Sequence, residues 1–197
     1  MAVTIVIALL GMQVLSPAIV SATNFSGATG STDKCKVNMA DNSLHTFWYE
    51  SLTTASSSAV NWARTNIYNP TDIDTTNAAA RTSSVDVIVH DAGYVGAWCG
   101  GVWYSNPGAT NGWVGYVTCE SLYGNTCEQH YLFFDTDYMG PQSTTNERSL
   151  ACHELGHTIG LLHRNNQTGV TGGCMPSSVN GLTRLTDHDI AHITSNY

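Results

Sequence analysis

The stretch that decides how the chain is interpreted runs from Ala151 to His163 and reads ACHELGHTIGLLH. On an α-helix, residues four apart lie one turn above each other on the same face, so His153 and His157 can both reach one cation. Gly160 tolerates a positive φ, so the helix can end there and the chain can turn His163 back toward the same ion. The spacing therefore predicts a metal site with three imidazole ligands.

A carboxylate lies within this pattern, because Glu154 directly follows the first histidine and is near the same helix face. Three neutral nitrogens leave most of the charge of Zn²⁺ uncompensated, which lowers the pKa of a water in the fourth tetrahedral position to about 7. A nearby carboxylate then serves as the general base. We expect a hydrolase site with one Zn²⁺. The alternative, solvated residues of an ordinary helix, does not explain the added glycine and third histidine.

The pattern HExxHxxGxxH at residues 153–163 resembles that of the metzincin zinc endopeptidases, which also carry a methionine turn downstream. Met175 follows a polar, glycine-rich linker, where that turn should fall. The resemblance covers residues 145–197. It implies an α+β fold in which a twisted mixed sheet packs on a backing helix and an active-site helix. It further implies a small C-terminal subdomain with the methionine turn and a terminal helix, and a metal in the cleft between the subdomains.

The resemblance also implies a role for Met175, which would pack beneath the metal without binding it. The short span from His163 to Met175 looks closest to small matrixin-like or snapalysin-like secreted proteases. Snapalysins, however, carry aspartate as the third ligand, and Arg164 stands where the named subfamilies usually carry other residues. No tyrosine stands two positions after Met175, which argues against an astacin-like or serralysin-like fifth ligand. The subfamily stays open.

Six cysteines together with a secretion signal indicate disulfides, and the sequence alone leaves fifteen pairings open. The fold that the resemblance implies favours three pairs: Cys152 with Cys174, Cys119 with Cys127, and Cys35 with Cys99. The first pair would tie the active-site helix to the methionine turn. As an alternative, Cys35 could cap the zinc as a thiolate, as the cysteine switch of matrixins does, although its flanking lysines do not match that family's pattern.

The N-terminal residues 2–20 are mostly apolar and uncharged, and small residues before Thr23 offer a cleavage site. We predict a signal peptide at 1–22, a secreted protein and no membrane contact after cleavage. No lysine or arginine precedes the apolar run, which leaves an uncleaved anchor as the alternative. Gln13 and Pro17 shorten the run below the roughly 20 residues that a membrane span needs.

Composition places the rest of the chain in one soluble domain. Residues 23–43 are rich in Gly, Ser and Thr and are predicted to be a flexible segment, and 44–197 is the predicted catalytic domain. The net charge of −8, without any cluster of Lys or Arg, argues against nucleic-acid binding. We expect a monomer whose partner is a protein or peptide substrate.

Apolar and aromatic runs bounded by turn residues predict the elements before the metal motif. In chain order these are a strand at 44–52, a backing helix at 53–68, a buried strand at 85–90, one or two strands within 93–120, and a last strand at 130–135. One strand within 93–120 is expected at the sheet edge. In the metzincin family, an edge strand at this point binds the peptide substrate as an added antiparallel strand.

The C-terminal part is predicted to hold two helices. Three residues are candidates to cap the first of them: Thr144, Thr145 and Asn146. Thr186 and Asp189 resemble a capping box for a terminal helix. Under the resemblance, residues 176–182 form a wall of the primed-side pocket, which takes the substrate residues after the scissile bond.

Two further groups of possible ligands carry weaker signals. His188 and His192 are also four apart, but they lack a following glutamate and a third histidine, which favours a solvated helix face. Asp72 and Asp74 fall short of the six to eight oxygens that Ca²⁺ prefers, so a structural calcium stays undecided.

The function predicted from the sequence is therefore a zinc-dependent endopeptidase with Glu154 as its general base. A different class is a catalytically silent metzincin-like domain that binds a peptide or protein through the same cleft. Such domains usually lack the glutamate or a ligand. Here Glu154 and all three histidines are present, which favours the enzyme.

Overall fold

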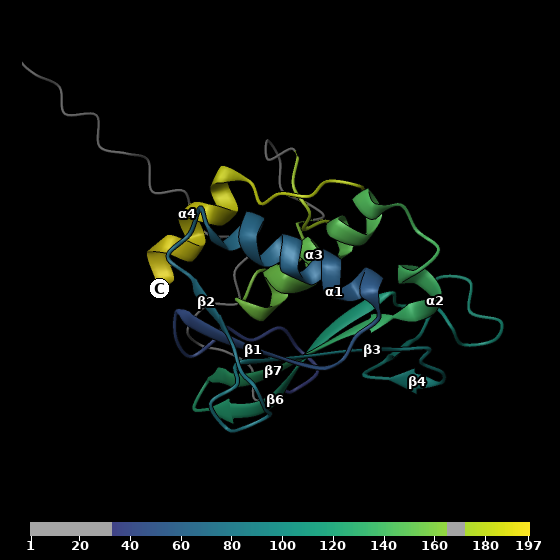
Figure 1. The fold of residues 1–197 in the computed structure, drawn as a ribbon, viewed down its shortest axis with the longest axis horizontal. Helices are drawn as coiled ribbons and strands as arrows, with labels where there is room; N and C mark the ends of the chain where they lie inside the picture. The colour runs from purple at the N-terminus through teal and green to yellow at the C-terminus, as the bar shows by residue number, and fades with distance from the viewer. Residues whose placement is uncertain (1–32, 165–171) are drawn as a thin grey trace, which may run out of the picture.

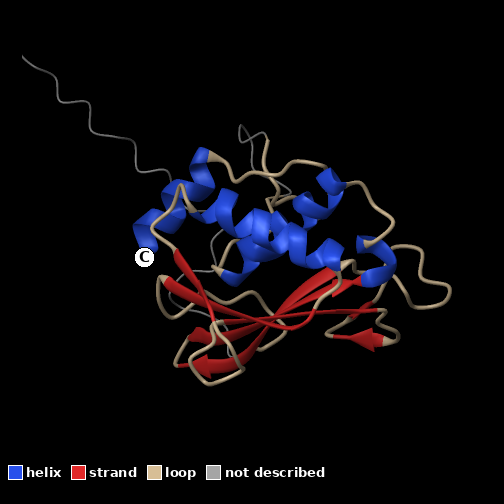
Figure 2. Ribbon diagram, in the orientation of Figure 1, coloured by secondary structure: helices blue, strands red, loops and turns tan. Residues whose placement is uncertain are grey.

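A helical layer lies on one face of a mixed β-sheet in the computed structural model, which describes residues 33–164 and 172–197 (Figures 1 and 2). The strands are β1 (Leu44–Ser51), β2 (Asp74–Asn77), β3 (Val87–Ala92), β4 (Ala97–Trp98), β5 (Gly101–Val102), β6 (Gly115–Tyr123) and β7 (Thr126–Asp135). The helices are α1 (Thr54–Ala63), η1 (Arg64–Tyr68), α2 (Thr136–Met139), α3 (Thr144–Thr158) and α4 (Asp187–Asn196). The α+β class with a mixed sheet is confirmed.

The main sheet has five strands in the order β2-β1-β3-β7-β6, and only β6 pairs antiparallel to its neighbour. Strand β3 is central, and Val87, Ile88 and Val89 are all fully buried, so both faces of this strand are covered. The antiparallel strand β6 is an edge strand, as predicted for part of residues 93–120. The remainder of that stretch forms the separate two-stranded sheet β4-β5.

Helices α1 and α3 pack on the same face of the sheet (Figure 2), and their apolar sides supply much of the core. Thr53 caps α1 by accepting a hydrogen bond from the backbone of Ser56. Asp91 at the end of β3 accepts hydrogen bonds from Thr53 N and Oγ1, which fixes the start of α1 to the sheet. This aspartate therefore has a structural role.

Several element boundaries differ from the sequence-based prediction. The backing helix changes to π-helical hydrogen bonding at η1, where Arg64 turns toward β2 and donates to the carbonyl of Thr76. The polar strand β2 and the one-turn helix α2 were not predicted, because neither shows an apolar period. The N-cap of α3 is Ser143, one residue before the first predicted candidate.

Residues 33–43, the described part of the segment 23–43 that was predicted to be flexible, include residues packed against the rest of the protein. Asn38, Met39 and Ala40 are buried, and Ala40 forms a β-bridge with Cys127. A disulfide and backbone pairing hold this part in place, and composition reveals neither. The signal peptide at 1–22 and the rest of the flexible segment lie outside the described residues. None of the described helices is long and apolar enough to cross a membrane.

Candidate metal centre and cleft

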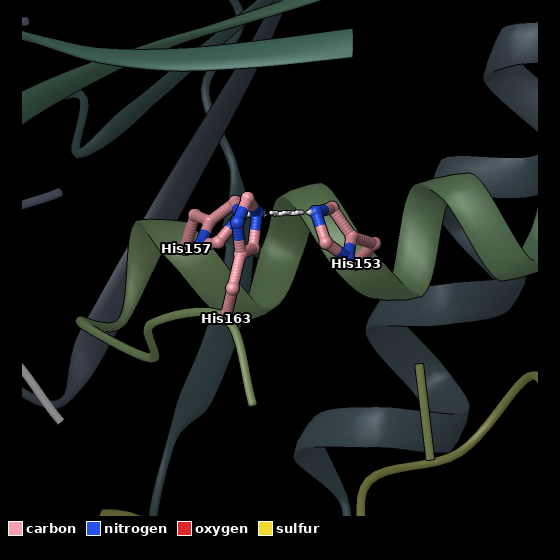
Figure 3. Close-up of side chains that lie close together, drawn as sticks. All are labelled: His153, His157 and His163. Atoms are coloured by element: carbon pink, nitrogen blue, oxygen red, sulfur yellow. Dashed lines mark hydrogen bonds between the residues drawn. The ribbon is translucent and has the colours of Figure 1, made fainter. Parts of the chain in front are cut away.

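Three imidazole rings converge where α3 ends and the following loop turns back (Figure 3). His153 and His157 extend from α3, and Gly160 adopts a φ of +98°, so the chain reverses and brings His163 to the same point. Each of the three pairs of Nε2 atoms is separated by 3.1 Å. The glycine therefore acts as the sequence predicted, and the three histidines lie together.

Backbone carbonyls fix the tautomer of the two helical histidines. His153 Nδ1 lies 2.8 Å from the carbonyl oxygen of Cys174, and His157 Nδ1 lies 2.6 Å from that of Leu161. A carbonyl only accepts, so each Nδ1 carries the proton and donates it. Each Nε2 is then unprotonated, and its lone pair points toward the other rings. This is the arrangement that supporting contacts give to metal-binding histidines.

The arrangement of the three rings suits a bound metal ion better than direct hydrogen bonds between the rings. Two unprotonated nitrogens cannot form a hydrogen bond, so the 3.1 Å between Nε2 of His153 and His157 is unfavourable without a positive charge between them. Tetrahedral Zn²⁺ with Zn–N of about 2.0–2.1 Å would place its nitrogens about 3.3–3.4 Å apart. The cluster can thus hold a metal ion, and the geometry alone does not identify which one.

Burial keeps the three rings in the form that binds metals. It lowers the pKa of His153 to about 4, and it lowers the pKa values of His157 and His163 as well. Repulsion from the neighbouring histidines adds to this effect for His153 and His157. All three are therefore neutral at pH 7, with lone pairs available for a cation.

Glu154 lies beside the cluster, only 4% exposed, and its position depends on a glycine in the edge strand. A Cβ atom at Gly115 would lie 2.4 Å from Glu154 Oε1, so no other residue fits there without displacing the carboxylate. Burial raises the pKa of Glu154 to about 8. No sequence pattern marks Gly115, because its contact with residue 154 depends on how β6 lies over α3.

Met175 packs beneath α3 and contacts the helix at a second glycine. A Cβ at Gly156 would lie 2.4 Å from Met175 Sδ, so the missing side chain provides the room for the thioether. A disulfide joins Cys152 to Cys174, and its Cα–Cα distance is 5.9 Å. The helix and the turn that holds Met175 are thus linked covalently as well as by packing.

A buried ion pair supports the third histidine from its other side. The N–H of Arg164, the residue after His163, donates to the carbonyl of Met175 at 3.0 Å. Its guanidinium Nε lies 3.3 Å from Oδ1 of Asp189, and the two side chains are 4% and 0% exposed. Asp189 also accepts from the N–H of Thr186, the N-cap of α4. The loop that carries His163 is therefore anchored to the terminal helix.

The cluster opens into a cleft of about 770 Å³, which the three histidines and Glu154 line together with β6 and the segment after Met175. Ser177, Ser178 and Val179 belong to this lining, within the stretch 176–182 that was predicted to form a pocket wall. Trp113 and Tyr116 also line the cleft, and their stacked rings have centroids 4.2 Å apart. The cleft is large enough to take several residues of a peptide.

Strand β6 presents to this cleft backbone groups that pair with no other strand among the described residues. The carbonyl of Val114 accepts from the N–H of Asp135 in β7, so this residue faces its sheet neighbour. Hydrogen-bonding residues alternate along an antiparallel strand, so Gly115 and Val117 direct their N–H and C=O groups toward the free edge. An extended peptide can pair with these two residues.

The free edge ends where the N-terminal segment crosses it. Cys119 N–H donates to the carbonyl of Lys34 at 3.0 Å, and Tyr116 Oη donates to the carbonyl of Cys35 at 2.6 Å. Cys35 and Val37 line the cleft. The segment thus occupies the edge beyond Val117.

The six cysteines form three disulfides, in the pairs that the assumed fold favoured: Cys35–Cys99, Cys119–Cys127 and Cys152–Cys174. The alternative of Cys35 as a zinc-binding thiolate is wrong, because its sulfur is bonded to Cys99. Three disulfides in one small domain indicate folding in an oxidising environment.

The remaining candidate ligands lie apart from this centre. Among the described residues, the only group of three or more metal-binding side chains is the one formed by His153, His157 and His163, so Asp72 and Asp74 gather no partners for calcium. His188 and His192 lie on α4, and His192 is 6% exposed, so the predicted solvated face is wrong for that residue.

Comparison of the chain with protein-family models and with curated proteins found no match. The centre and its cleft therefore have to be interpreted from their own geometry.

Proposed function

We propose that the protein is a secreted zinc-dependent endopeptidase of the metzincin type, which acts as a monomer on protein or peptide substrates. One observation carries the proposal. The unprotonated Nε2 atoms of His153 and His157 face the ring of His163 in a cleft that also contains a buried carboxylate and a free strand edge. A metal site, a general base and a peptide-binding edge are the three parts that metal-dependent peptide hydrolysis needs.

The side chains divide the work of the reaction. His153, His157 and His163 hold the metal, which supplies a Lewis acid that polarises a carbonyl group and lowers the pKa of water. Glu154 accepts a proton from the attacking water and returns it to the leaving amine. A carboxylate whose burial raises its pKa holds a transferred proton more firmly than an exposed one, and a bound cation moderates that effect.

The substrate binds as an additional strand on β6. Its backbone pairs with Gly115 and Val117, which gives an affinity that depends little on side chains. Because the added strand is antiparallel to β6, the N-terminal part of the peptide points toward Cys119 and the segment at Lys34. The C-terminal part lies toward Trp113 and the wall at residues 177–179.

Two features support the metzincin type specifically. Met175 packs against Gly156 on the side of α3 that carries the metal site, as the methionine of that family would. The residues after it line the cleft. The predicted signal peptide and the three disulfides support secretion.

The competing function is a silent domain that binds peptides through the same cleft. The glycine that makes room for the Glu154 carboxylate argues for the enzyme, because a domain that only binds has no need of a buried base.

The test uses the purified protein and a diverse peptide library, with cleavage sites identified by mass spectrometry. We expect cleavage by the wild type, loss of cleavage with a zinc chelator, and no cleavage by Glu154→Ala, which still binds zinc. A wild-type protein that binds one zinc tightly and cleaves no peptide contradicts the proposal and favours the silent domain.

A further inference from the structure

A second pair of histidines, on α4, repeats the geometry of the helical pair in the metal centre. The Nε2 atoms of His188 and His192 lie 3.1 Å apart, and their ring centroids are 4.3 Å apart at 89°. In His153 and His157 of the candidate metal centre, the Nε2 atoms lie 3.1 Å apart, and the ring centroids are 4.6 Å apart with an interplanar angle of 85°. The two pairs therefore present their nitrogens at nearly the same separation and ring angle.

We propose that His188 and His192 form a second, weaker binding site for a divalent transition-metal ion of the Zn²⁺ or Cu²⁺ kind. Imidazole nitrogen suits both ions, and two histidines at i and i+4 on one helix face can bind the same ion. His192 is 6% exposed, whereas His188 is half-buried. One ring is therefore held by packing, and the other is accessible to an ion from solvent.

Water completes the coordination shell of this site. The carboxylate of Asp189, on the same turn of the helix, is engaged by the guanidinium of Arg164 and by the N–H and hydroxyl of Thr186. The described residues place no third histidine, cysteine or carboxylate with this pair. Fewer protein ligands mean weaker binding than at the three-histidine centre.

An ion bound here stabilises the terminal helix. It clamps one turn of α4, and the same turn carries Asp189, whose ion pair with Arg164 anchors the loop of His163. Figure 1 shows α4 at one end of the helical layer. Metal binding at α4 therefore stabilises the folded protein without touching the cleft.

The test is equilibrium dialysis of the purified protein against rising free Zn²⁺, with zinc per chain measured by atomic absorption. The wild type is expected to take up one ion tightly and a second at higher free zinc. His188→Gln keeps the first and loses the second, and so does His192→Gln. His90→Gln, which replaces a histidine outside both pairs, serves as the control and keeps both ions.

Thermal unfolding gives a second readout. The second ion is expected to raise the unfolding midpoint of the wild type by a few degrees, because binding only to the folded state stabilises it, and to leave that of His188→Gln unchanged. If the two rings instead share only a hydrogen bond, the wild type takes up no second ion. That outcome overturns the proposal, as does a second ion retained by both histidine variants.

Discussion

The two helical histidine pairs of this molecule have the same geometry and different surroundings. His153 and His157 point into a cleft, each has a carbonyl partner for Nδ1, and a third histidine completes the cluster. His188 and His192 have the same separation of nitrogens but no third side chain of that kind among the described residues. In both helices, histidines at positions i and i+4 thus place two ring nitrogens close enough to bind one ion.

The features that distinguish the three-histidine cluster on α3 from the pair on α4 come from elsewhere in the chain. Gly160 allows the reversal that returns His163, and the ion pair of Arg164 with Asp189 holds that loop in place. Gly115 in β6 leaves room for Glu154. The difference between the two pairs therefore lies in the backbone around them.

Removing the third histidine should make the two pairs alike, and it has the largest expected effect. His163→Ala leaves a two-histidine site on α3, so its zinc affinity should fall toward that of the α4 pair. The loss should exceed the ten- to hundredfold that a missing supporting contact costs, since a direct ligand is gone. Activity is expected to disappear. Zinc titration, with two weak equivalents in place of one tight and one weak, is the measurement.

A tight zinc equivalent retained by His163→Ala would mean that the third histidine is not a ligand. The matched control is His188→Gln, which removes a histidine from the other helix and should leave activity unchanged.

The second prediction concerns Glu154, the carboxylate beside His153 and His157. Glu154→Gln keeps the size of the side chain and removes the general base, so the rate of peptide cleavage should fall by roughly 10²–10⁴-fold. Zinc binding should remain, because the three imidazoles are untouched. Rates with a fluorogenic peptide, measured beside zinc content, separate the two effects. A variant with near wild-type rate would show that another group accepts the proton.

The third prediction tests whether the edge strand positions the base. Gly115→Ala places a Cβ 2.4 Å from Glu154 Oε1, so the carboxylate must move, and we expect a loss of roughly 10–10²-fold in kcat/KM with zinc content unchanged. The control is Gly140→Ala, whose Cβ would meet only the carbonyl of Thr136 at an ordinary 3.7 Å. Equal activity of the two variants would refute the positioning role.

Sequence patterns predict the parts of this fold that depend on local spacing. The strand at β1, the backing helix, the buried strand at β3 and the edge strand within residues 93–120 all follow apolar or aromatic periods. The convergence of three histidines was predictable for the same reason, because a helical turn and one glycine determine it.

The parts that could not be predicted depend on contacts between distant residues. Gly115 matters only because β6 lies over α3, and nothing near residue 115 signals this. Strand β2 is polar and exists because it pairs with β1 in parallel. Residues 33–43 are packed because Cys35 is bonded to Cys99 and Ala40 bridges to Cys127. Composition describes only the average character of such a segment.

The last prediction concerns a buried histidine that belongs to neither helical pair. Replacing it should change the stability of the protein but not catalysis. His45 is fully buried, and burial, together with repulsion from His130, lowers its pKa to about 3. Burial also lowers the pKa of His130 to about 4.

In the unfolded chain both histidines titrate near 6.5, so below that pH the unfolded state binds protons that the folded state does not. Stability should therefore fall as the pH decreases from about 6.5 toward 4. Replacing His45 with leucine removes one of these groups, so the loss between pH 7 and pH 4.5 should shrink by about 1–3 kcal/mol. Urea unfolding of both proteins at the two pH values measures the difference. Equal losses in the two proteins would show that this histidine is charged when folded.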